Sequence, residues 1–153
     1  MRNAGEGIRS SGAYVLVIDL ARDQRLVVGK LGEFRFPAGT YAYVGSAMGG
    51  LGGRLGRHLN PGRKVHWHID RLTRAGTIRG AFVIPSMERQ ECALSDALGH
   101  LDGSNPMCPG FGCSDCNCIT HLFRVEAPAI SRMGRLYGAM LPAEILIRQS
   151  SRR

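Results

Sequence analysis

TYAYVGSAMGGLGGRLGRHL, residues 40–59, is the stretch that decides the fold of this chain. Its beginning, Thr40–Val44, is rich in β-branched and aromatic residues and predicts a strand. Gly45-Ser46-Ala47 is expected to break this strand, and the glycines at 49 and 50 let the backbone turn. Apolar residues then recur at every fourth position, which is typical of one face of a helix; they are Leu51, Leu55 and Leu59. The stretch therefore predicts a strand, a glycine-rich turn and an amphipathic helix.

The predicted helix also carries polar residues that suggest a function. Arg54 and His58 are four positions apart and share one strip of the helix surface, whereas Arg57 is expected to point elsewhere. A glycine-rich first turn allows a bulky group such as a sugar-phosphate chain to approach the backbone closely. A turn that merely tolerates glycine would produce the same pattern, so this stretch alone leaves both interpretations open.

The charge of the chain favours a polyanionic partner. The 153 residues are enough for one domain with one core, and they carry a formal net charge of +8. Eighteen of the twenty basic residues are Arg, which suits bidentate binding of phosphate. Seven basic residues and a single acidic one fall between Leu51 and Arg79, and such clustering points first to nucleic acid. A solvated basic face without a ligand is the alternative.

The N-terminal sequence and the cysteines predict a cytoplasmic protein. MRNAGEGIRSSG lacks the apolar core of a secretory signal, and the chain has no apolar run long enough to span a membrane. Without an export signal, five cysteines favour reduced thiols or metal ligands over a disulfide framework.

The remaining pattern predicts an α/β fold in one domain, residues 12–140, between a flexible leader, 1–11, and a frayed tail, 141–153. Strands at 14–20 and 25–31, and then a loop at 34–39 before the strand at Thr40, suggest a three-stranded antiparallel meander. The other predicted elements are helices at 65–74, 87–101 (capped by Ser86) and 130–140, and strands at 77–84 and 121–125.

One acidic residue stands out in the predicted helix 87–101. Glu91 falls on the same stripe as Leu94, Leu98 and Leu101, so its carboxylate is expected to face the sheet. Charged groups are rarely placed there without a partner, which makes Glu91 a candidate functional residue. A partly exposed glutamate at the edge of a helix is the simpler alternative.

The chain lacks the motifs of nucleotide-binding loops and of serine hydrolases, but a metal site remains open. The glycines of residues 45–53 match neither G-x-x-x-x-G-K-[ST] nor G-x-G-x-x-G, and the chain contains no G-x-S-x-G. Cys113, Cys116, Cys118 and His121 offer four soft ligands within nine residues, with Cys108 as a fifth, and zinc binds four such groups. Because these ligands form one knuckle rather than two, reduced thiols in a packed loop are favoured over zinc. His66 and His68 point to opposite sides of the predicted helix 65–74, and neither is favoured as a ligand.

The order of these residues resembles the GIY-YIG nuclease superfamily. Gly12-Ala13-Tyr14 stands in place of GIY, and Tyr43-Val44-Gly45 in place of YIG. Arg54, His58 and Glu91 then match the helix arginine, the His or Tyr one turn later, and the metal-binding glutamate. More closely, the chain is similar to a branch of unknown function that is sometimes fused to endonuclease III, through the phrases FPAGTYAYVGSAMGGLGGRLGRHL, HWHIDRL and GFGCSDCNCITHLF.

The resemblance implies a small mixed, mainly antiparallel sheet flanked by helices. It also implies that Tyr14 or Tyr43 assists the attacking water, that Arg54 neutralises the scissile phosphate, and that His58 is an alternative base or proton carrier. By the same resemblance, Glu91 binds one Mg²⁺ or Mn²⁺. A tyrosine has an unperturbed pKa of about 10, so it needs a cation, a metal or His58 nearby to act as a base.

The leading hypothesis is a metal-dependent DNA endonuclease that hydrolyses phosphodiester bonds in damaged, branched or single-stranded DNA, in repair or processing. One alternative is a non-catalytic nucleic-acid-binding module of the same fold that acts with a base-excision repair partner. Another is an enzyme of a different class that uses the cysteine- and histidine-bearing segment. The residues expected to bind nucleic acid are Ser46, Arg57, Arg63, Lys64, Arg71 and Arg74.

Overall fold

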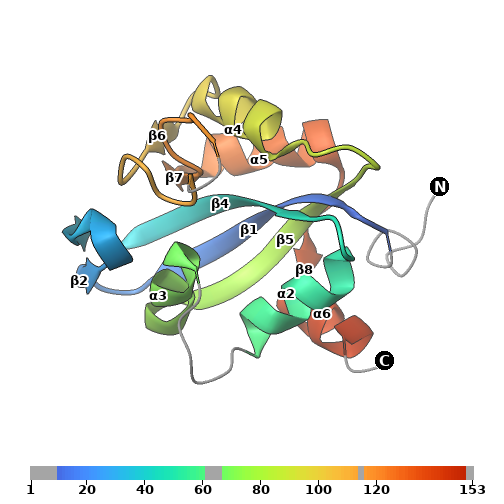
Figure 1. The fold of residues 1–153 in the computed structure, drawn as a ribbon, viewed down its shortest axis with the longest axis horizontal. Coiled ribbons are helices and arrows are strands. Elements are labelled where there is room, and N and C mark those ends of the chain that lie inside the picture. The colour runs from blue at the N-terminus through green and yellow to red at the C-terminus, as the bar shows by residue number, and fades with distance from the viewer. Residues whose placement is uncertain (1–9, 61–66, 114–115, 151–153) are drawn as a thin grey trace.

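The chain folds into three layers, with helices on both faces of a central sheet (Figure 1). This computed structural model describes residues 10–60, 67–113 and 116–150. Arg63, Lys64 and His66, together with residues 1–9 of the predicted leader, lie outside the described residues. Ser10 and Ser11, at the end of that leader, accept backbone hydrogen bonds from Leu51 and Ser86 and so are tied to the domain.

The sheet has six strands in the order β6-β7-β4-β1-β5-β8, and each pairing described is antiparallel. The sequence predicted an α/β fold with a mainly antiparallel sheet flanked by helices, and this fold class is confirmed. The strands are β1 (Gly12–Leu20), β4 (Gly39–Ala47), β5 (Thr77–Pro85), β6 (Ser104–Pro106), β7 (Leu122–Val125) and β8 (Leu141–Pro142).

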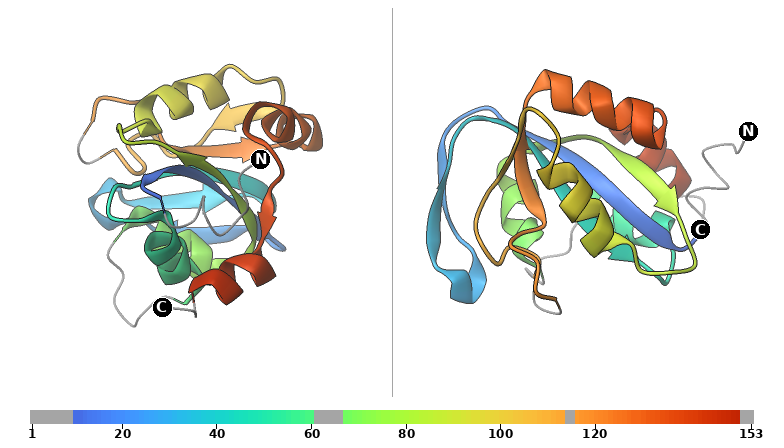
Figure 2. Two further views of the ribbon diagram at one scale, coloured as in Figure 1. Left: turned by 90° about the vertical axis from the view of Figure 1, so that its right-hand side faces the viewer. Right: turned by 90° about the horizontal axis from the view of Figure 1, so that it is seen from above.

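The central strand β1 divides the interior into two cores because its side chains alternate between the two faces of the sheet. Tyr14, Leu16 and Ile18 pack on one face against α2 (Leu51–Leu59), α3 (His68–Ala75) and α6 (Ala143–Ser150). Val15 and Val17 pack on the other face against α4 (Glu91–Gly99) and α5 (Ala127–Tyr137). The left view of Figure 2 shows these helix layers above and below the sheet.

The predicted three-stranded meander is wrong in its middle strand. β1 pairs directly with β4, and residues 24–36 form a separate hairpin of β2 (Gln24–Val27) and β3 (Glu33–Phe36), joined by the short 3-10 helix η1 (Gly29–Leu31). The expected strand at 25–31 therefore ends at Val27, and part of the expected loop at 34–39 is a strand. Residues of β2 alternate between half-buried and exposed, so this hairpin lies at the surface, whereas β1 and β4 are buried on both faces.

Other boundaries differ for local reasons. Gly45-Ser46-Ala47 does not break the strand, because all three residues pair with β1 and extend β4 to Ala47. The predicted helix 87–101 begins only at Glu91, since the Ser86 hydroxyl accepts a hydrogen bond from the Glu88 N–H and forms a turn instead of a helix cap. Residues 141–150, assigned to a tail by the sequence, form β8 and α6, and Leu146 is buried against α2.

Within the described residues, none of the helices is long and apolar enough to cross a membrane.

Candidate active site

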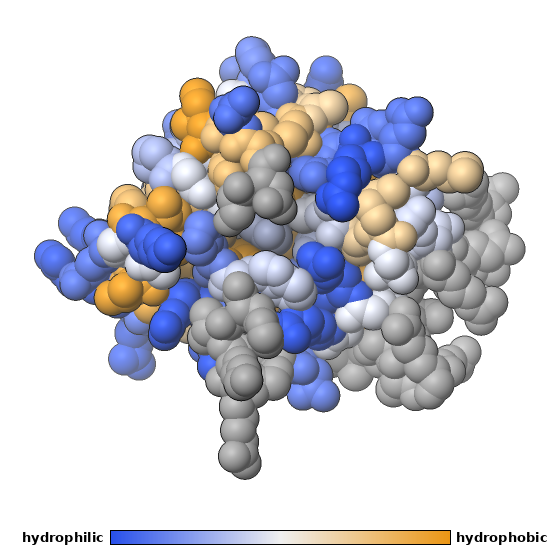
Figure 3. Space-filling model, in the orientation of Figure 1, coloured by the Kyte–Doolittle hydropathy of each residue, from blue (hydrophilic) through white to orange (hydrophobic). Residues whose placement is uncertain are grey.

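A pocket of about 530 Å³ lies beside the C-terminal part of strand β4. Strand β7 pairs with β4 only as far as Tyr43, and one further hydrogen bond joins Val44 N–H to the His121 carbonyl. From Gly45 onward, this edge of β4 borders the pocket. Hydrophilic side chains gather between the α4 and α2 layers on the face seen in Figure 3. The pocket is lined by Tyr43, Val44, Gly45, Ser46, Arg54, Trp67, His68, Arg89, Glu91, Cys92, Gly112, Cys116 and His121.

Tyr14 and His58 form a buried pair behind the pocket. The Tyr14 hydroxyl and His58 Nε2 share a hydrogen bond at 2.6 Å, and both side chains are almost completely buried. The Tyr43 ring packs against both of them, with centroids 6.3 Å from the Tyr14 ring and 6.3 Å from the His58 ring. Only Tyr43 of these three lines the pocket itself, so it is the phenol placed to meet a ligand directly.

Burial sets the protonation states of this aromatic group. It raises the pKa of Tyr14 well above its ordinary value and the pKa of Tyr43 to about 12, while the Arg54 charge opposes both shifts. Burial also lowers the pKa of His58 to about 4. At neutral pH all three groups are therefore uncharged. Arg54 is the neighbour that would stabilise a phenolate.

The protein is expected to lose stability as the pH falls from about 6.5 to 4. The unfolded chain binds a proton at His58 near its ordinary pKa of 6.5, whereas the folded chain does so only near 4. This contribution is fully present above pH 6.5 and amounts to on the order of 3 kcal/mol. Urea denaturation at pH 7.5 and pH 5 measures the loss, which should be smaller in His58→Gln. The variant His100→Gln, at an exposed position, should behave as the wild type, and an equal loss in all three proteins would contradict the prediction.

Two arginines of α2 lie against the indole ring of Trp67. The guanidinium of Arg54 lies 4.4 Å from the Trp67 ring centroid and that of Arg57 lies 4.3 Å from it, which are close cation–π distances. Arg57 also lies 3.8 Å from the buried carboxylate of Asp70, which accepts a hydrogen bond from the backbone N–H of Trp67. Arg57 therefore reaches the same ring as Arg54, although the helix spacing predicted that it points elsewhere. Trp67 was not predicted as a site residue; it lies in the phrase HWHIDRL but carries no titratable group.

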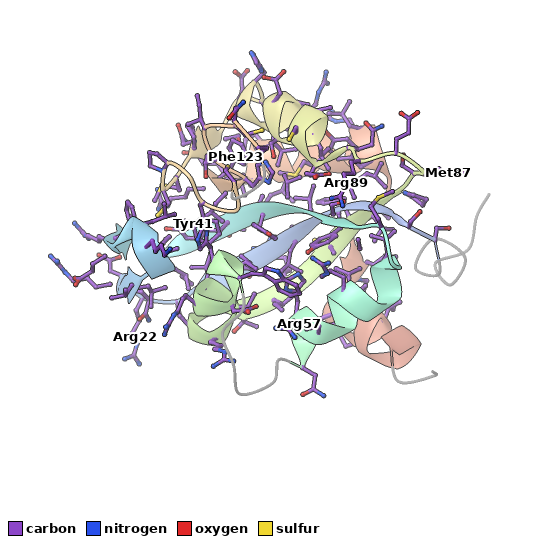
Figure 4. All side chains as sticks on the ribbon, viewed as in Figure 1. Arg22, Tyr41, Arg57, Met87, Arg89 and Phe123 are labelled. Carbon is purple, nitrogen blue, oxygen red and sulfur yellow. The ribbon has the colours of Figure 1, made fainter. Side chains whose placement is uncertain are left out.

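Glu91 reaches the pocket from the other side of the sheet. Helix α4 packs on the face opposite to Tyr14, but its first residue lies by the edge of β4 and lines the same pocket as Tyr43 and Arg54. The Glu91 side chain is 18% exposed, and its Oε1 lies 3.7 Å from Arg89 Nη1. Its Oε2 is buried and has no hydrogen-bond partner among the described residues. Arg89, which sequence analysis missed, lies above the sheet in Figure 4, while Arg57 lies below it.

Gly45 is required by the position of Tyr14. A Cβ atom at this residue would overlap the Tyr14 ring and hydroxyl. Gly45→Ala is therefore expected to lower the free energy of unfolding by about 1–3 kcal/mol, the usual cost of overpacking, and to displace the Tyr14 hydroxyl from His58.

The matched control for that substitution is Gly49→Ala, because a Cβ atom at Gly49 would meet no heavy atom within 4 Å among the described residues other than its chain neighbours. This variant should be neutral or more stable by up to about 1 kcal/mol. Urea denaturation of both variants makes the comparison, and equal stability of the two would show that Tyr14 does not depend on Gly45.

Some of the residues expected to bind nucleic acid lie at the pocket, and others lie outside it. Ser46 lines it with a buried hydroxyl that has no hydrogen-bond partner in the described part of the chain. Arg71 and Arg74 are exposed on α3, outside the pocket lining. His68, not expected to bind a metal, accepts a hydrogen bond at Nδ1 from the Gly112 N–H.

Comparison with known families gives one match. A family described as a domain of unknown function, DUF123, matches residues 13–139. The chain belongs to the DUF123 family. The match extends from β1 to just beyond α5 and includes Tyr14, Tyr43, Arg54, His58 and Glu91. Comparison with curated proteins found no match, and neither did comparison with solved structures.

Proposed function

We propose that this DUF123 chain is a GIY-YIG-type endonuclease that uses Mg²⁺ or Mn²⁺ to hydrolyse phosphodiester bonds in DNA. The observation that carries the proposal is the convergence of Tyr43, Arg54 and Glu91 on one pocket from three different elements. A phenol, a guanidinium and a carboxylate supply the three functions that hydrolysis needs, namely positioning of water, neutralisation of the phosphate and binding of a hard cation. Repair or processing of damaged, branched or single-stranded DNA is the proposed role.

Arg54 is the group proposed to hold the scissile phosphate. Its guanidinium stacks on Trp67, which orients it at the pocket at a low entropic cost. A planar guanidinium binds two phosphate oxygens at once and stabilises the charge that develops on them in the transition state. The Ser46 hydroxyl, which has no partner among the described residues, is available for a third hydrogen bond to the phosphate.

Glu91 fits the requirements of a magnesium ligand. Mg²⁺ keeps several waters and is commonly held by one or two carboxylates together with substrate phosphates, so a single protein carboxylate is sufficient. The buried Oε2 of Glu91, without a hydrogen-bond partner in the described part of the chain, is available for this purpose. When bound, the cation supplies a water of lowered pKa and polarises the phosphoryl oxygen. The exposed Arg89 side chain, now beside Glu91, can turn toward the phosphate.

Proton transfer is assigned to the tyrosines and His58. Tyr43, the phenol that lines the pocket, takes a proton from the attacking water as it releases its own toward the Tyr14–His58 pair packed behind it, where His58 is the final acceptor. The water oxygen forms a bond to phosphorus while the bond to one ester oxygen breaks, and the released alkoxide takes a proton from the solvent. The absent Cβ of Gly45 lets the Tyr14 hydroxyl approach the edge of the pocket.

A second candidate function is a non-catalytic DNA-binding module that acts with a repair partner. The pKa values favour this function, because burial moves the pKa of Tyr14, Tyr43 and His58 away from 7, where a general base works best. Phosphate binding by Arg54 and Arg57 needs no such base. A cytoplasmic location fits either function, since the five free cysteines are stable in a reducing compartment.

The test is incubation of the purified protein with labelled duplex, gapped, branched and single-stranded DNA in Mg²⁺, Mn²⁺ or EDTA. Nicking in either metal, none in EDTA, and none by the double variant Arg54→Ala/Glu91→Gln would support the nuclease. Fluorescence anisotropy with the same DNAs measures binding. Binding without cutting on every substrate would favour the binding module, and absence of both would overturn both functions.

A further inference from the structure

The side chains of Cys92, Cys116, Cys118 and His121 form a cluster beside the pocket. Each offers one ligand atom, and these four atoms all lie within 4.8 Å of one another. Within the cluster, Cys116 Sγ lies 3.5 Å from His121 Nε2. Cys92 comes from the first turn of α4, while the other three come from the segment before β7. Two parts of the chain that are distant in sequence thus present four soft ligands to one point.

We propose that this cluster binds a single Zn²⁺ ion as a tetrahedral site with three cysteine sulfurs and one histidine nitrogen. Cys₃His is one of the ligand sets of structural zinc sites. The proposal is independent of the nuclease function, since it uses neither Tyr43 nor Arg54 nor Glu91.

The spacing of the ligands favours one metal ion over a cluster of metals. Zn–S bonds of about 2.3 Å arranged tetrahedrally place the sulfur atoms about 3.8 Å apart. The observed limit of 4.8 Å is within about 1 Å of this value, a change that side-chain rotations of these incompletely buried cysteines can supply. An iron–sulfur cluster must seat several metal atoms between its ligands and therefore needs a wider arrangement.

The fold changes which cysteine completes the site. The sequence suggested Cys113 with Cys116, Cys118 and His121, but Cys113 lies outside the group and its thiol donates to the Phe111 carbonyl at 3.3 Å. Cys92 takes its place. The four ligands then come from two separated segments, which is the usual arrangement of a closed zinc site and removes the objection to a single knuckle.

Zinc at this position would fix the geometry of the neighbouring pocket. Cys92 directly follows Glu91 on α4, and His121 itself lines the pocket. The loop also carries Gly112, where a Cβ atom would lie 3.2 Å from the Tyr43 ring. With four protein ligands the ion has no open position, so its role is to cross-link α4, on one face of the sheet, to the loop that packs on Tyr43.

The test is the metal content of protein purified under reducing conditions without added metal, measured by elemental mass spectrometry. The wild type and Cys113→Ser are expected to hold about one zinc per chain, whereas Cys92→Ser and Cys118→Ser should hold little. Cobalt exchanged into the wild type and Cys113→Ser should show thiolate-to-cobalt charge-transfer absorption, which Cys92→Ser should lack. The Cys92 side chain is exposed, so this variant should fold, and circular dichroism checks that it does.

A second measurement on the wild type does not depend on any variant. Alkylation followed by mass spectrometry should show Cys92, Cys116 and Cys118 protected until a chelator is added. Absence of zinc even after incubation with Zn²⁺, a disulfide from Cys92 to Cys116 or Cys118, or zinc lost in Cys113→Ser but kept in Cys92→Ser would each overturn the proposal. Zinc binding without DNA nicking would support the zinc site and contradict only the nuclease proposal. DNA nicking by a protein that binds no zinc would contradict only the zinc site.

Discussion

Arg54→Ala is expected to lower the rate of DNA nicking by roughly 10²–10³-fold, which is the usual cost of removing one preorganised donor to a developing charge. The effect is large because Arg54 lines the pocket beside Tyr43 and its charge also favours ionisation of both phenols. Single-turnover assays with saturating protein measure the chemical step apart from binding. Arg54→Lys should recover little of the rate, because lysine lacks the planar fork that stacks on Trp67 and binds two oxygens.

The matched control is Arg132→Ala. This arginine is exposed on α5 and does not line the pocket, so the substitution removes the same charge without touching the site. Its rate should equal that of the wild type. A loss in Arg54→Ala of less than about tenfold, or an equal loss in both variants, would mean that Arg54 does not stabilise the transition state.

Glu91→Gln is expected to reduce metal-dependent nicking to background while DNA binding is kept. The amide has almost the same shape as the carboxylate but lacks the charge that holds a hard cation. Removal of a negative charge from the pocket should also leave the affinity for DNA in EDTA unchanged or slightly higher. Nicking assays with Mg²⁺ and Mn²⁺, and anisotropy in EDTA, measure the two effects.

Glu88→Gln provides the control for this second prediction. Glu88 is exposed, lies three positions earlier, and does not line the pocket. Glu91→Gln should also keep its zinc, because Glu91 is not one of the four clustered ligands. Wild-type nicking by Glu91→Gln in Mg²⁺ would show that the proposed cation site is elsewhere.

Much of the candidate site could be predicted from the sequence because its elements are locally determined. The period of Leu51 and Leu55 defines α2 and its buried face, and with it the strip that carries Arg54 and His58. The β-branched run of β1 similarly predicts a buried strand that carries Tyr14. Trp67 and Arg89 could not be found in this way, because an aromatic at a helix start and an arginine in a loop acquire a role only from what they contact.

The topology was less predictable. The strands of the hairpin at residues 24–36 have the alternation of a strand that is exposed on one face, and the sequence contains no signal for which partner they pair with. The pairing of β1 with β4 is decided by the burial of both strands between two helix layers, and burial is a property of the whole fold.

The sequence by itself determined the central strands, the helix that follows β4, and which residues are candidates for the proposed chemistry, since these depend on side-chain periods over a few turns. Only the tertiary structure decided that Glu91, on a helix of the opposite face of the sheet, lines the same pocket as Tyr43, and that Cys92 rather than Cys113 joins Cys116, Cys118 and His121. Both outcomes depend on where α4 begins and how it lies against the edge of β4. That placement results from packing between residues far apart in the chain, which no local pattern encodes.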